Sequence, residues 1–176
     1  DRLNAARPEL ALDRLEQAKI QVNAGNAGAF PLHFDVPAAK GARRCLTAIL
    51  YLNPNWHEHD GGEVETLPFP FRSIATPPMN RRLVVFSALT TMHRVRPFSG
   101  LAGRVCVNLW FEGDFIRPFP EPLPMEDYDS RATKVVQVLR RSPHELRAFC
   151  KVWYQDEIAA SLRDAFAKCA DLEAAI

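Results

Sequence analysis

Cysteine is scarce in this sequence of 176 residues, and the spacing of its four cysteines excludes a disulfide scaffold. The thiols stand at positions 45, 106, 150 and 169, and no two of them form a C-x-x-C pair. Small domains held together by disulfides carry denser and more regularly spaced cysteines. We therefore expect reduced thiols, with Cys45 and Cys106 inert in the core.

Long hydrophobic runs and an excess of one charge are also missing. No apolar run reaches the roughly 18 residues of a membrane-spanning helix, and the N-terminus lacks the pattern of a signal peptide. Lys and Arg number 22 and Asp and Glu number 21, which gives a formal net charge of +1. Without a basic surplus, nothing in the composition favours nucleic acid or an acidic membrane as a partner. We expect neither partner, and an intracellular location in the cytoplasm or the nucleus.

Hydrophobic residues (47%) and charged residues (24%) are present in the proportions of an average soluble globular protein. A length of 176 residues suits one domain. Proline is abundant, with 14 residues and a dense set between Pro68 and Pro124. Because proline interrupts helices and central strands, we expect turns between strands at several of them: Pro31, Pro37, Pro54 and the prolines of residues 68–78.

Strand signals fill the middle of the chain, and helical signals lie at both ends. Segments with β-prone or alternating residues are 19–23, 45–53, 63–67, 82–86, 93–97 and 104–111. Apolar residues at helical spacing predict a short amphipathic helix over Pro8–Ala18 and helices over residues 129–141 and 142–170. Ser142, with Pro143 and Glu145, forms the capping box of the last helical region. The sequence predicts an α+β fold whose mainly β core, a sandwich or barrel, is braced by helices.

His33 and Asp35 are separated by one residue, and His93 follows much later in the chain. In a strand, residues i and i+2 point to the same face, so His33 and Asp35 can offer ligand atoms to one ion. Two imidazoles and one carboxylate form the facial triad of non-haem Fe(II) oxygenases, which leaves positions open for a cosubstrate and dioxygen. The short H-x-D spacing also occurs by chance in residues that make ordinary hydrogen bonds. The spacing alone leaves both interpretations open.

Arg104 stands eleven residues after His93, at the start of the apolar segment of residues 105–111. A buried guanidinium is costly without an anion, and its fork of donors suits a bidentate carboxylate. Tyr51 lies within another apolar segment, where a buried hydroxyl also needs a partner. The two residues are candidates for binding a dicarboxylate, the alternatives being a surface arginine and an ordinary core tyrosine.

Taken together, these features resemble the 2-oxoglutarate and Fe(II)-dependent dioxygenases, and within them the prolyl 4-hydroxylase-like branch that contains the hypoxia-inducible-factor prolyl hydroxylases. The resemblance covers about residues 19–113. It rests on blocks in the family's order: His33-Phe-Asp35, residues 46–53 with Trp56, Gly61-Gly62, and residues 82–86, 93–97 and 104–111. No single block is specific, but their shared order is.

The resemblance implies a double-stranded β-helix, or jelly roll, with Fe(II) held by His33, Asp35 and His93. It also implies that Arg104 binds the distal carboxylate of 2-oxoglutarate, with a hydrogen bond from Tyr51. Such enzymes convert 2-oxoglutarate and dioxygen to succinate and carbon dioxide while they hydroxylate a substrate, and ascorbate is the expected reductant. The substrate implied is proline in a protein or peptide. We assign the dioxygenase domain to residues 1–116, with residues 117–176 as a proline-rich arm and helical extension packed on it.

Three positions depart from the family pattern. Asn23, ten residues before His33, and Phe30 stand where the nearest relatives carry tyrosines. Asn108, four residues after Arg104, lies on the same face of its strand. Asn23 and Asn108 are therefore candidates for polar contacts with the cosubstrate. The segment before His33 is also short for the family, which is consistent with a fragment of a larger protein.

Other polar residues have two interpretations. Residues 57–60, His-Glu-His-Asp, could form a second metal site, but a solvated turn beside Gly61-Gly62 is preferred. Arg43 and Arg44 could line a substrate entrance or lie in a solvated loop. Trp110 could face the site, although a packing role is preferred.

Two other functions stay open at this point. The same chemistry could act on a small metabolite, free amino acid or nucleobase, because the motifs concern only iron and cosubstrate. The jelly roll could also be a non-catalytic interaction domain in a larger assembly. An intact set of five metal and cosubstrate residues argues against this second alternative, since a scaffold has no physical need for all of them.

Overall fold

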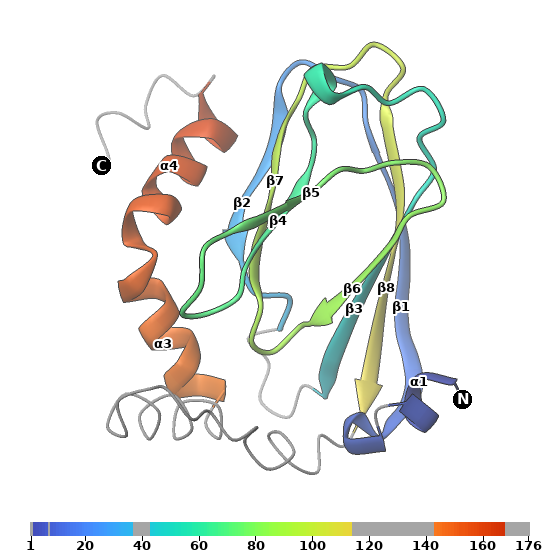
Figure 1. Cartoon of the computed structure of the whole chain (residues 1–176), viewed down its shortest axis with the longest axis vertical. Helices are drawn as coiled ribbons and strands as arrows, with labels where there is room; N and C mark the ends of the chain where they lie inside the picture. Colours follow the sequence, from blue (N-terminus) through green and yellow to red (C-terminus); the bar gives the residue numbers. More distant parts are fainter. Residues whose placement is uncertain (1, 7, 37–42, 114–142, 168–176) are drawn as a thin grey trace.

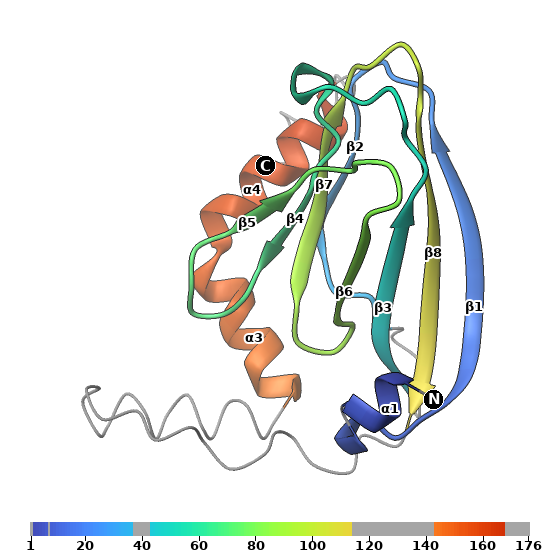
Figure 2. The same ribbon diagram turned by 45° about the vertical axis from the view of Figure 1, so that its right-hand side comes forward.

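Two four-stranded antiparallel sheets face each other in the computed structural model of the chain, which describes residues 2–6, 8–36, 43–113 and 143–167 (Figures 1 and 2). The first sheet, in spatial order, consists of β1 (Leu12–Asn23), β8 (Arg104–Gly113), β3 (Arg44–Tyr51) and β6 (Leu83–Ser87). The second consists of β2 (Gly28–His33), β7 (Met92–Phe98), β4 (Val64–Leu67) and β5 (Ile74–Thr76). The remaining elements are α1 (Arg2–Ala6), η1 (Pro8–Leu10), η2 (Glu58–Asp60), α3 (Pro143–Trp153) and α4 (Gln155–Phe166). This is the predicted double-stranded β-helix with C-terminal helices.

The N-terminal segment differs from the prediction. The helix predicted for Pro8–Ala18 is wrong, because α1 and η1 lead directly into the long strand β1. The pairing of β1 with β8 shifts register between Leu12 and Arg14 and again between Leu15 and Gln17. Each shift interrupts the two-residue alternation of a strand, so the spacing of the apolar residues imitates that of a helix.

Each of the six predicted strand segments overlaps an observed strand, although residues 52–53, 63 and 82 lie outside the strands, and β2 and β5 are additional. The turn predicted at Pro31 is wrong, because this residue lies inside β2. β2 is at the edge of the second sheet, where a residue without an N–H group is tolerated.

Helices α3 and α4 cover the outer face of the second sheet (Figures 1 and 2). The Ser161 hydroxyl of α4 accepts a hydrogen bond from the backbone N–H of Leu32 at 3.0 Å. The helices therefore support β2 from outside, next to the position of His33. The buried apolar side chains that helix and sheet share include Leu146, Cys150, Leu67 and Met92.

Some predictions lie outside the described residues. These are the helix over residues 129–141, the cap at Ser142, and the end of the last helix beyond residue 167. The predicted domain boundary between residues 116 and 117 also lies outside the described residues and stays a prediction. Among the residues that the structure does describe, no helix has the length and apolarity needed to cross a membrane.

The main core lies between the two sheets. Its buried residues include Ile49 and Tyr51 of β3, Val64 of β4 and Cys106 of β8. The predicted burial of the Cys45 and Cys106 thiols is confirmed. Their burial raises the pKa of both thiols, so they remain protonated and inert at neutral pH.

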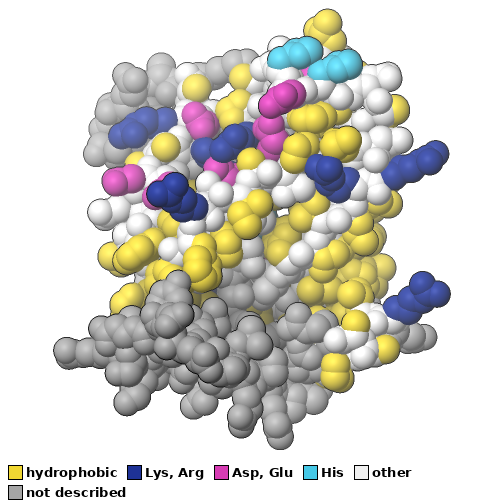
Figure 3. All heavy atoms as spheres, viewed as in Figure 1, with side chains coloured by type: hydrophobic (Ala, Val, Ile, Leu, Met, Phe, Trp, Pro, Cys, Tyr) yellow, Lys and Arg dark blue, Asp and Glu magenta, His cyan; other side chains and the backbone are white. Residues whose placement is uncertain are grey.

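The outer face of the first sheet is apolar and open to solvent. Ile20 of β1 is 71% exposed and Leu83 of β6 is 56% exposed. Hydrophobic side chains are visible over this part of the molecule at the right of Figure 3.

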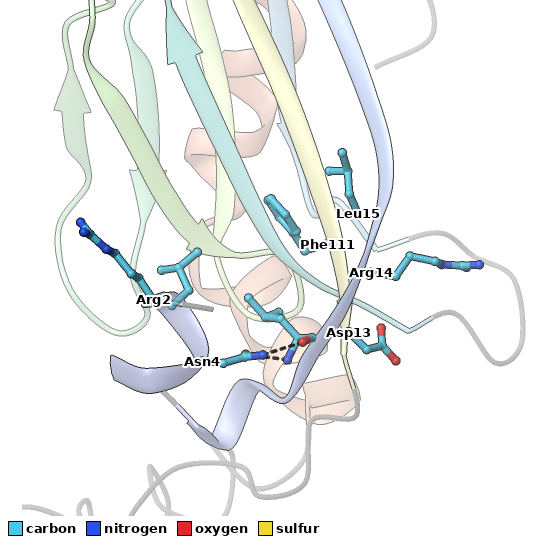
Figure 4. A pocket seen from close by; sticks show the side chains of 8 residues that line it. Arg2, Asn4, Asp13, Arg14, Leu15 and Phe111 are labelled. Carbon is cyan, nitrogen blue, oxygen red and sulfur yellow. Dashed lines mark hydrogen bonds between the residues drawn. The ribbon is translucent and has the colours of Figure 1, made fainter.

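A pocket of about 420 Å³ lies between α1 and the adjoining ends of β1 and β8 (Figure 4), and its lining includes Leu3, Leu15 and Phe111. None of the predicted metal or cosubstrate residues lines this pocket.

Candidate active site

Three side chains from neighbouring segments of the second sheet converge on one point. His33 at the end of β2 is paired directly with His93 of β7, and Asp35 follows two residues after His33. The His33 Nε2 atom lies 3.3 Å from Asp35 Oδ1, and the His93 Nε2 atom lies 3.6 Å from Asp35 Oδ2. One ligand atom from each residue lies within 4.8 Å of the other two. The structure thus brings together the three residues predicted as metal ligands.

Both imidazoles are oriented through their Nδ1 atoms. The Nδ1 of His33 lies 2.9 Å from the Pro31 carbonyl oxygen, and that of His93 lies 3.3 Å from the Thr91 carbonyl oxygen. Because a carbonyl oxygen only accepts, each Nδ1 is the donor in its contact, and Nε2 is the ring nitrogen that faces Asp35. The two contacts orient both Nε2 atoms toward the place where a metal would bind.

The Asp35 carboxylate is held from the first sheet. Its Oδ2 atom accepts hydrogen bonds from the Thr47 hydroxyl at 2.6 Å and from the Trp110 indole N–H at 3.1 Å. The packing role preferred for Trp110 is therefore wrong, because its N–H contacts a candidate metal ligand. Thr47 was not predicted as a site residue, although a hydroxyl inside the apolar run of residues 45–52 could have indicated a polar contact there.

The protonation states of the cluster suit a divalent cation. Burial by itself raises the pKa of Asp35, but the hydrogen bond with His33, the nearby His93 and two hydrogen-bond donors lower it well below its usual value. Burial and the adjacent His33 lower the pKa of His93 to about 4. At neutral pH the cluster therefore holds an ionised carboxylate and a neutral His93 imidazole, the forms that bind metals.

Arg104 is buried in the sandwich, with 1% of its surface exposed. Its Nε donates to the Gly62 carbonyl oxygen at 2.7 Å, and its Nη2 donates to the Tyr51 hydroxyl at 3.4 Å. Among the described residues, no carboxylate forms an ion pair with it. Burial raises the pKa of Tyr51 to about 12, so its phenol keeps a proton to donate. A buried guanidinium with donors to spare fits a bound carboxylate.

The metal cluster and the Arg104 site face the same interior. Thr47 and Tyr51 share one face of β3, because they are four residues apart in a strand. Thr47 contacts Asp35, and Tyr51 contacts Arg104. Trp110 and Arg104 likewise share one face of β8, and Trp110 contacts Asp35. The metal cluster and the Arg104 site therefore both lie between the two sheets.

Gly62 has a role at this site that the sequence does not reveal. Its φ is +79°, and a Cβ atom built there would lie 2.8 Å from the Cδ atom of Arg104. Its carbonyl oxygen accepts the hydrogen bond from Arg104 Nε. Glycine here allows the close approach that fixes the guanidinium.

Asn108 is buried on the interior face of β8. Its Nδ2 donates to the Gln21 side-chain oxygen at 3.0 Å, and its Oδ1 lies 3.8 Å from the Cys106 sulfur. It lies on the same face of β8 as Arg104, and a contact with the cosubstrate stays a prediction.

Asn23 is opposite Arg104 in the pairing of β1 with β8, but its side chain is engaged in the turn that follows. Its Nδ2 donates to the Gly28 carbonyl oxygen at 2.9 Å, and its Oδ1 accepts from the Gly25 N–H at 3.1 Å. The structure therefore gives Asn23 a role in the turn, and a cosubstrate contact stays a prediction.

The loop of residues 57–60 is a solvated turn. The His59 side chain is 82% exposed, and the described part of the chain contains no second cluster with the geometry of a metal site.

Arg43 and Arg44, predicted either to line a substrate entrance or to lie in a solvated loop, differ in their surroundings. Arg43 pairs with Asp13 at the surface, whereas Arg44 is largely buried.

A family model described as the 2OG-Fe(II) oxygenase superfamily matches residues 19–112, just over half of the chain. Its span contains all seven predicted metal and cosubstrate residues. Two imidazoles and a carboxylate fit Fe(II), and the Arg104 site fits the distal carboxylate of 2-oxoglutarate.

Solved structures of prolyl hydroxylases are similar to this chain. A prolyl 4-hydroxylase from Phytophthora capsici has a TM-score of 0.75 and 31% identity over 98% of this chain and 59% of that chain. A prolyl-4-hydroxylase from Pseudomonas putida has a TM-score of 0.56 and 25% identity over 63% of this chain and 57% of that chain. A prolyl hydroxylase from Trichoplax adhaerens, in complex with a peptide fragment of the hypoxia-inducible-factor oxygen degradation domain, has a TM-score of 0.52 and 25% identity over 58% and 46%. The chain thus spans less than two thirds of each of these proteins.

Proposed function

Because the chain belongs to the 2OG-Fe(II) oxygenase superfamily, we propose that it uses Fe(II), 2-oxoglutarate and dioxygen to hydroxylate proline in a protein or peptide. The observation that carries the proposal is the convergence of His33, Asp35 and His93 within 4.8 Å. The oriented imidazoles and the ionised carboxylate would supply three ligands of the kinds that bind Fe(II) in non-haem oxygenases.

Each residue of the site has a defined task in this proposal. His33, Asp35 and His93 hold the iron, which supplies the oxidising chemistry when cosubstrate and dioxygen are bound. Arg104 binds the distal carboxylate of 2-oxoglutarate, and the Tyr51 hydroxyl donates to the same carboxylate. Because this pair is buried, water is kept from the charged contact and the contact is stronger.

The proline substrate is supported by similarity. The chain is 31% identical to a prolyl 4-hydroxylase over nearly its whole length, and one related structure contains a bound peptide fragment. The iron and cosubstrate residues do not themselves select the substrate, so a peptide is preferred over a metabolite on this support alone. An intracellular location and ascorbate as the reductant stay predictions.

Mass spectrometry of proline-containing peptides tests the proposal. The protein is incubated with Fe(II), 2-oxoglutarate, ascorbate and a peptide library, alongside His93→Ala. We expect some peptides to gain one oxygen atom on proline with the native chain and none with the variant. Hydroxylation of free amino acids or metabolites only, with 2-oxoglutarate consumed, would replace the peptide substrate by the small-molecule alternative. Native 2-oxoglutarate consumption no greater than that of the variant would exclude the enzyme activity itself.

A further inference from the structure

Arg44 lies beside the metal cluster, at the start of β3. Its side chain is 13% exposed, and its guanidinium donates in two directions. Nε and Nη2 donate to the two carboxylate oxygens of Glu16, at 2.7 and 3.0 Å. Nη1 donates to the backbone carbonyl oxygen of Asp35 at 2.9 Å. A planar fork that is engaged on two sides has little freedom to turn.

Arg44 also reaches the Asp35 side chain through Trp110. The Cζ atom of Arg44 lies 4.8 Å from the centroid of the Trp110 ring, at cation–π distance. The Trp110 indole N–H in turn donates to Asp35 Oδ2. One guanidinium therefore contacts the backbone of Asp35 directly and fixes the indole that holds its carboxylate.

The strand irregularities of the first sheet place this ion pair. In the pairing of β1 with β8, Leu15 is opposite Phe111 and Gln17 is opposite Trp110, so Glu16 is an extra, bulged residue. A second register shift follows Arg44 in the pairing of β3 with β8. Bulges redirect side chains and occur often beside active sites. Glu16 of β1 and Arg44 of β3 meet across β8, which lies between these two strands.

Asp35 needs such support because it lies two residues beyond the end of β2. We propose that Glu16 and Arg44 form a clamp that positions Asp35 as a metal ligand. Asp35 is held on its backbone side by Arg44 and on its carboxylate side by Trp110 and Thr47. The proposal rests on the proposed function only in that Asp35 binds the metal. Glu16 and Arg44 are positioning residues, since neither contributes a ligand atom to the metal cluster.

Positioning and simple electrostatics predict different effects of charge removal on metal affinity. If only the local charge mattered, loss of the Arg44 cation would strengthen binding of a divalent metal and loss of the Glu16 anion would weaken it. If the pair positions Asp35, then Arg44→Gln, Arg44→Lys and Glu16→Gln all weaken binding. Lysine keeps the charge but lacks the planar fork that contacts Glu16, Asp35 and the indole.

The test is titration of the 176-residue chain with Co(II), which reports binding through its visible absorption bands independently of turnover. Residues that orient metal ligands through hydrogen bonds contribute about 10- to 100-fold in affinity. We therefore expect about a tenfold or greater increase in the Co(II) Kd for both Arg44 variants, and a change in the same direction for Glu16→Gln. In the double variant Glu16→Gln, Arg44→Gln, the Co(II) Kd should rise by less than the product of the two single increases.

Arg14→Gln is the matched control. Arg14 pairs with Glu112 across β1 and β8, as Glu16 does with Arg44 across the first sheet, but its side chain is 67% exposed and does not contact Asp35. Its Co(II) Kd should equal that of the native chain. Circular dichroism identifies any variant that fails to fold. If Arg44→Gln fails, Arg44→Lys decides between the two explanations, because lysine keeps the positive charge and only positioning then predicts weaker binding.

The outcomes separate the clamp from the proposed function. A Co(II) spectrum that is abolished by His93→Ala but unchanged by Arg44→Gln, Arg44→Lys and Glu16→Gln would overturn the clamp alone. Tighter binding by Arg44→Gln would also overturn it, in favour of a charge effect. Absence of any His93-dependent Co(II) signal in the native chain would overturn both the clamp and the metal site.

Discussion

Arg104 and Tyr51 share a buried contact in which the guanidinium carbon lies 5.1 Å from the centroid of the phenol ring and Nη2 lies 3.4 Å from the hydroxyl. The two residues come from β8 and β3, which are neighbours in the first sheet. Both side chains are buried, on the faces of β8 and β3 that also carry the Trp110 and Thr47 contacts with Asp35. The geometry thus gives a carboxylate two different donors, one charged and one neutral.

The Tyr51→Phe substitution tests the neutral donor. A hydrogen bond to a charged group contributes about 1.5–3 kcal/mol, so we expect 2-oxoglutarate to bind roughly 10- to 150-fold more weakly. The measurement is calorimetric titration of 2-oxoglutarate into Mn(II)-loaded protein. Tyr154→Phe is the control, because the Tyr154 hydroxyl donates to the Phe71 carbonyl oxygen on the outer side of the second sheet. Equal Kd values for native protein and Tyr51→Phe would remove Tyr51 from the cosubstrate site.

The Gly62→Ala substitution should disturb Arg104. The added Cβ would lie 2.8 Å from Arg104 Cδ and 2.9 Å from a Phe98 ring carbon, at a φ of +79°. We expect weaker 2-oxoglutarate binding in the same titration, together with a lower melting temperature, because the guanidinium must move.

Gly103→Ala is the matched control for this change. Gly103 has a φ of +75°, so alanine has similar backbone strain there, but its nearest contact would be the Asn23 carbonyl oxygen at 3.5 Å. Both variants should lose stability, of order 1 kcal/mol from the backbone alone. If Gly103→Ala weakens 2-oxoglutarate binding as much as Gly62→Ala does, the effect is general and the assigned contact with Arg104 is not its cause.

The Glu65 carboxylate should make stability depend on acid pH. Glu65 lies on the outer side of the second sheet and accepts hydrogen bonds from Arg94 and Arg96. Burial raises the pKa of Glu65, but these hydrogen bonds outweigh it and lower the pKa from about 4.5 to about 2. Because the folded-state pKa is lowered, the stabilisation is complete above about pH 4.5 and disappears as the pH falls through about 2.

Glu65→Gln should therefore cost about 2 kcal/mol of unfolding free energy at pH 7, allowing for solvent screening at the partly exposed Arg96. The difference from native protein should shrink between pH 4.5 and pH 2. Urea unfolding at a series of pH values measures it, with the exposed Glu157→Gln on α4 as control. A difference that stays constant down to pH 2 would contradict the assigned pKa.

Ser161→Ala should loosen α4 from β2. The Ser161 hydroxyl accepts from Leu32 N–H and donates to the Ile158 carbonyl oxygen at 2.8 Å. Its removal leaves a buried N–H group without a partner, which costs about 1–3 kcal/mol. Urea unfolding should show this loss, whereas the exposed Ser99→Ala should change stability by less than about 0.5 kcal/mol. Equal stability of Ser161→Ala and native protein would mean that the helix does not depend on this contact.

Regular alternation made most strands predictable from the sequence. Irregular strand pairing explains why a helix was wrongly predicted for Pro8–Ala18. The segments that became β3, β7 and β8 have continuous apolar or alternating residues, and their pairing is mostly in register. β1 has two register shifts near its start, so its apolar residues follow no two-residue period. A bulge depends on the partner strand, and a single segment does not encode it locally.

The site was predictable where one residue has one chemical role, and less so where the role comes from a distant contact. His33, Asp35 and His93 are types that bind metals; their spacing allowed a cluster, and the resemblance to the dioxygenases pointed to it. Trp110 and Arg44 are compatible with packing or solvent, and their contacts with Asp35 form only when the two sheets come together.

Succinate formation from 2-oxoglutarate tests the central claim most directly. Purified native chain, His93→Ala and Asp35→Ala are compared with Fe(II), ascorbate, dioxygen and 2-oxoglutarate, with and without chelator, and succinate is quantified by mass spectrometry. We predict succinate from the native chain only, lost on chelation of the iron and absent in both variants. Equal succinate from all three proteins, or none from a native chain that binds both iron and 2-oxoglutarate, would contradict the account.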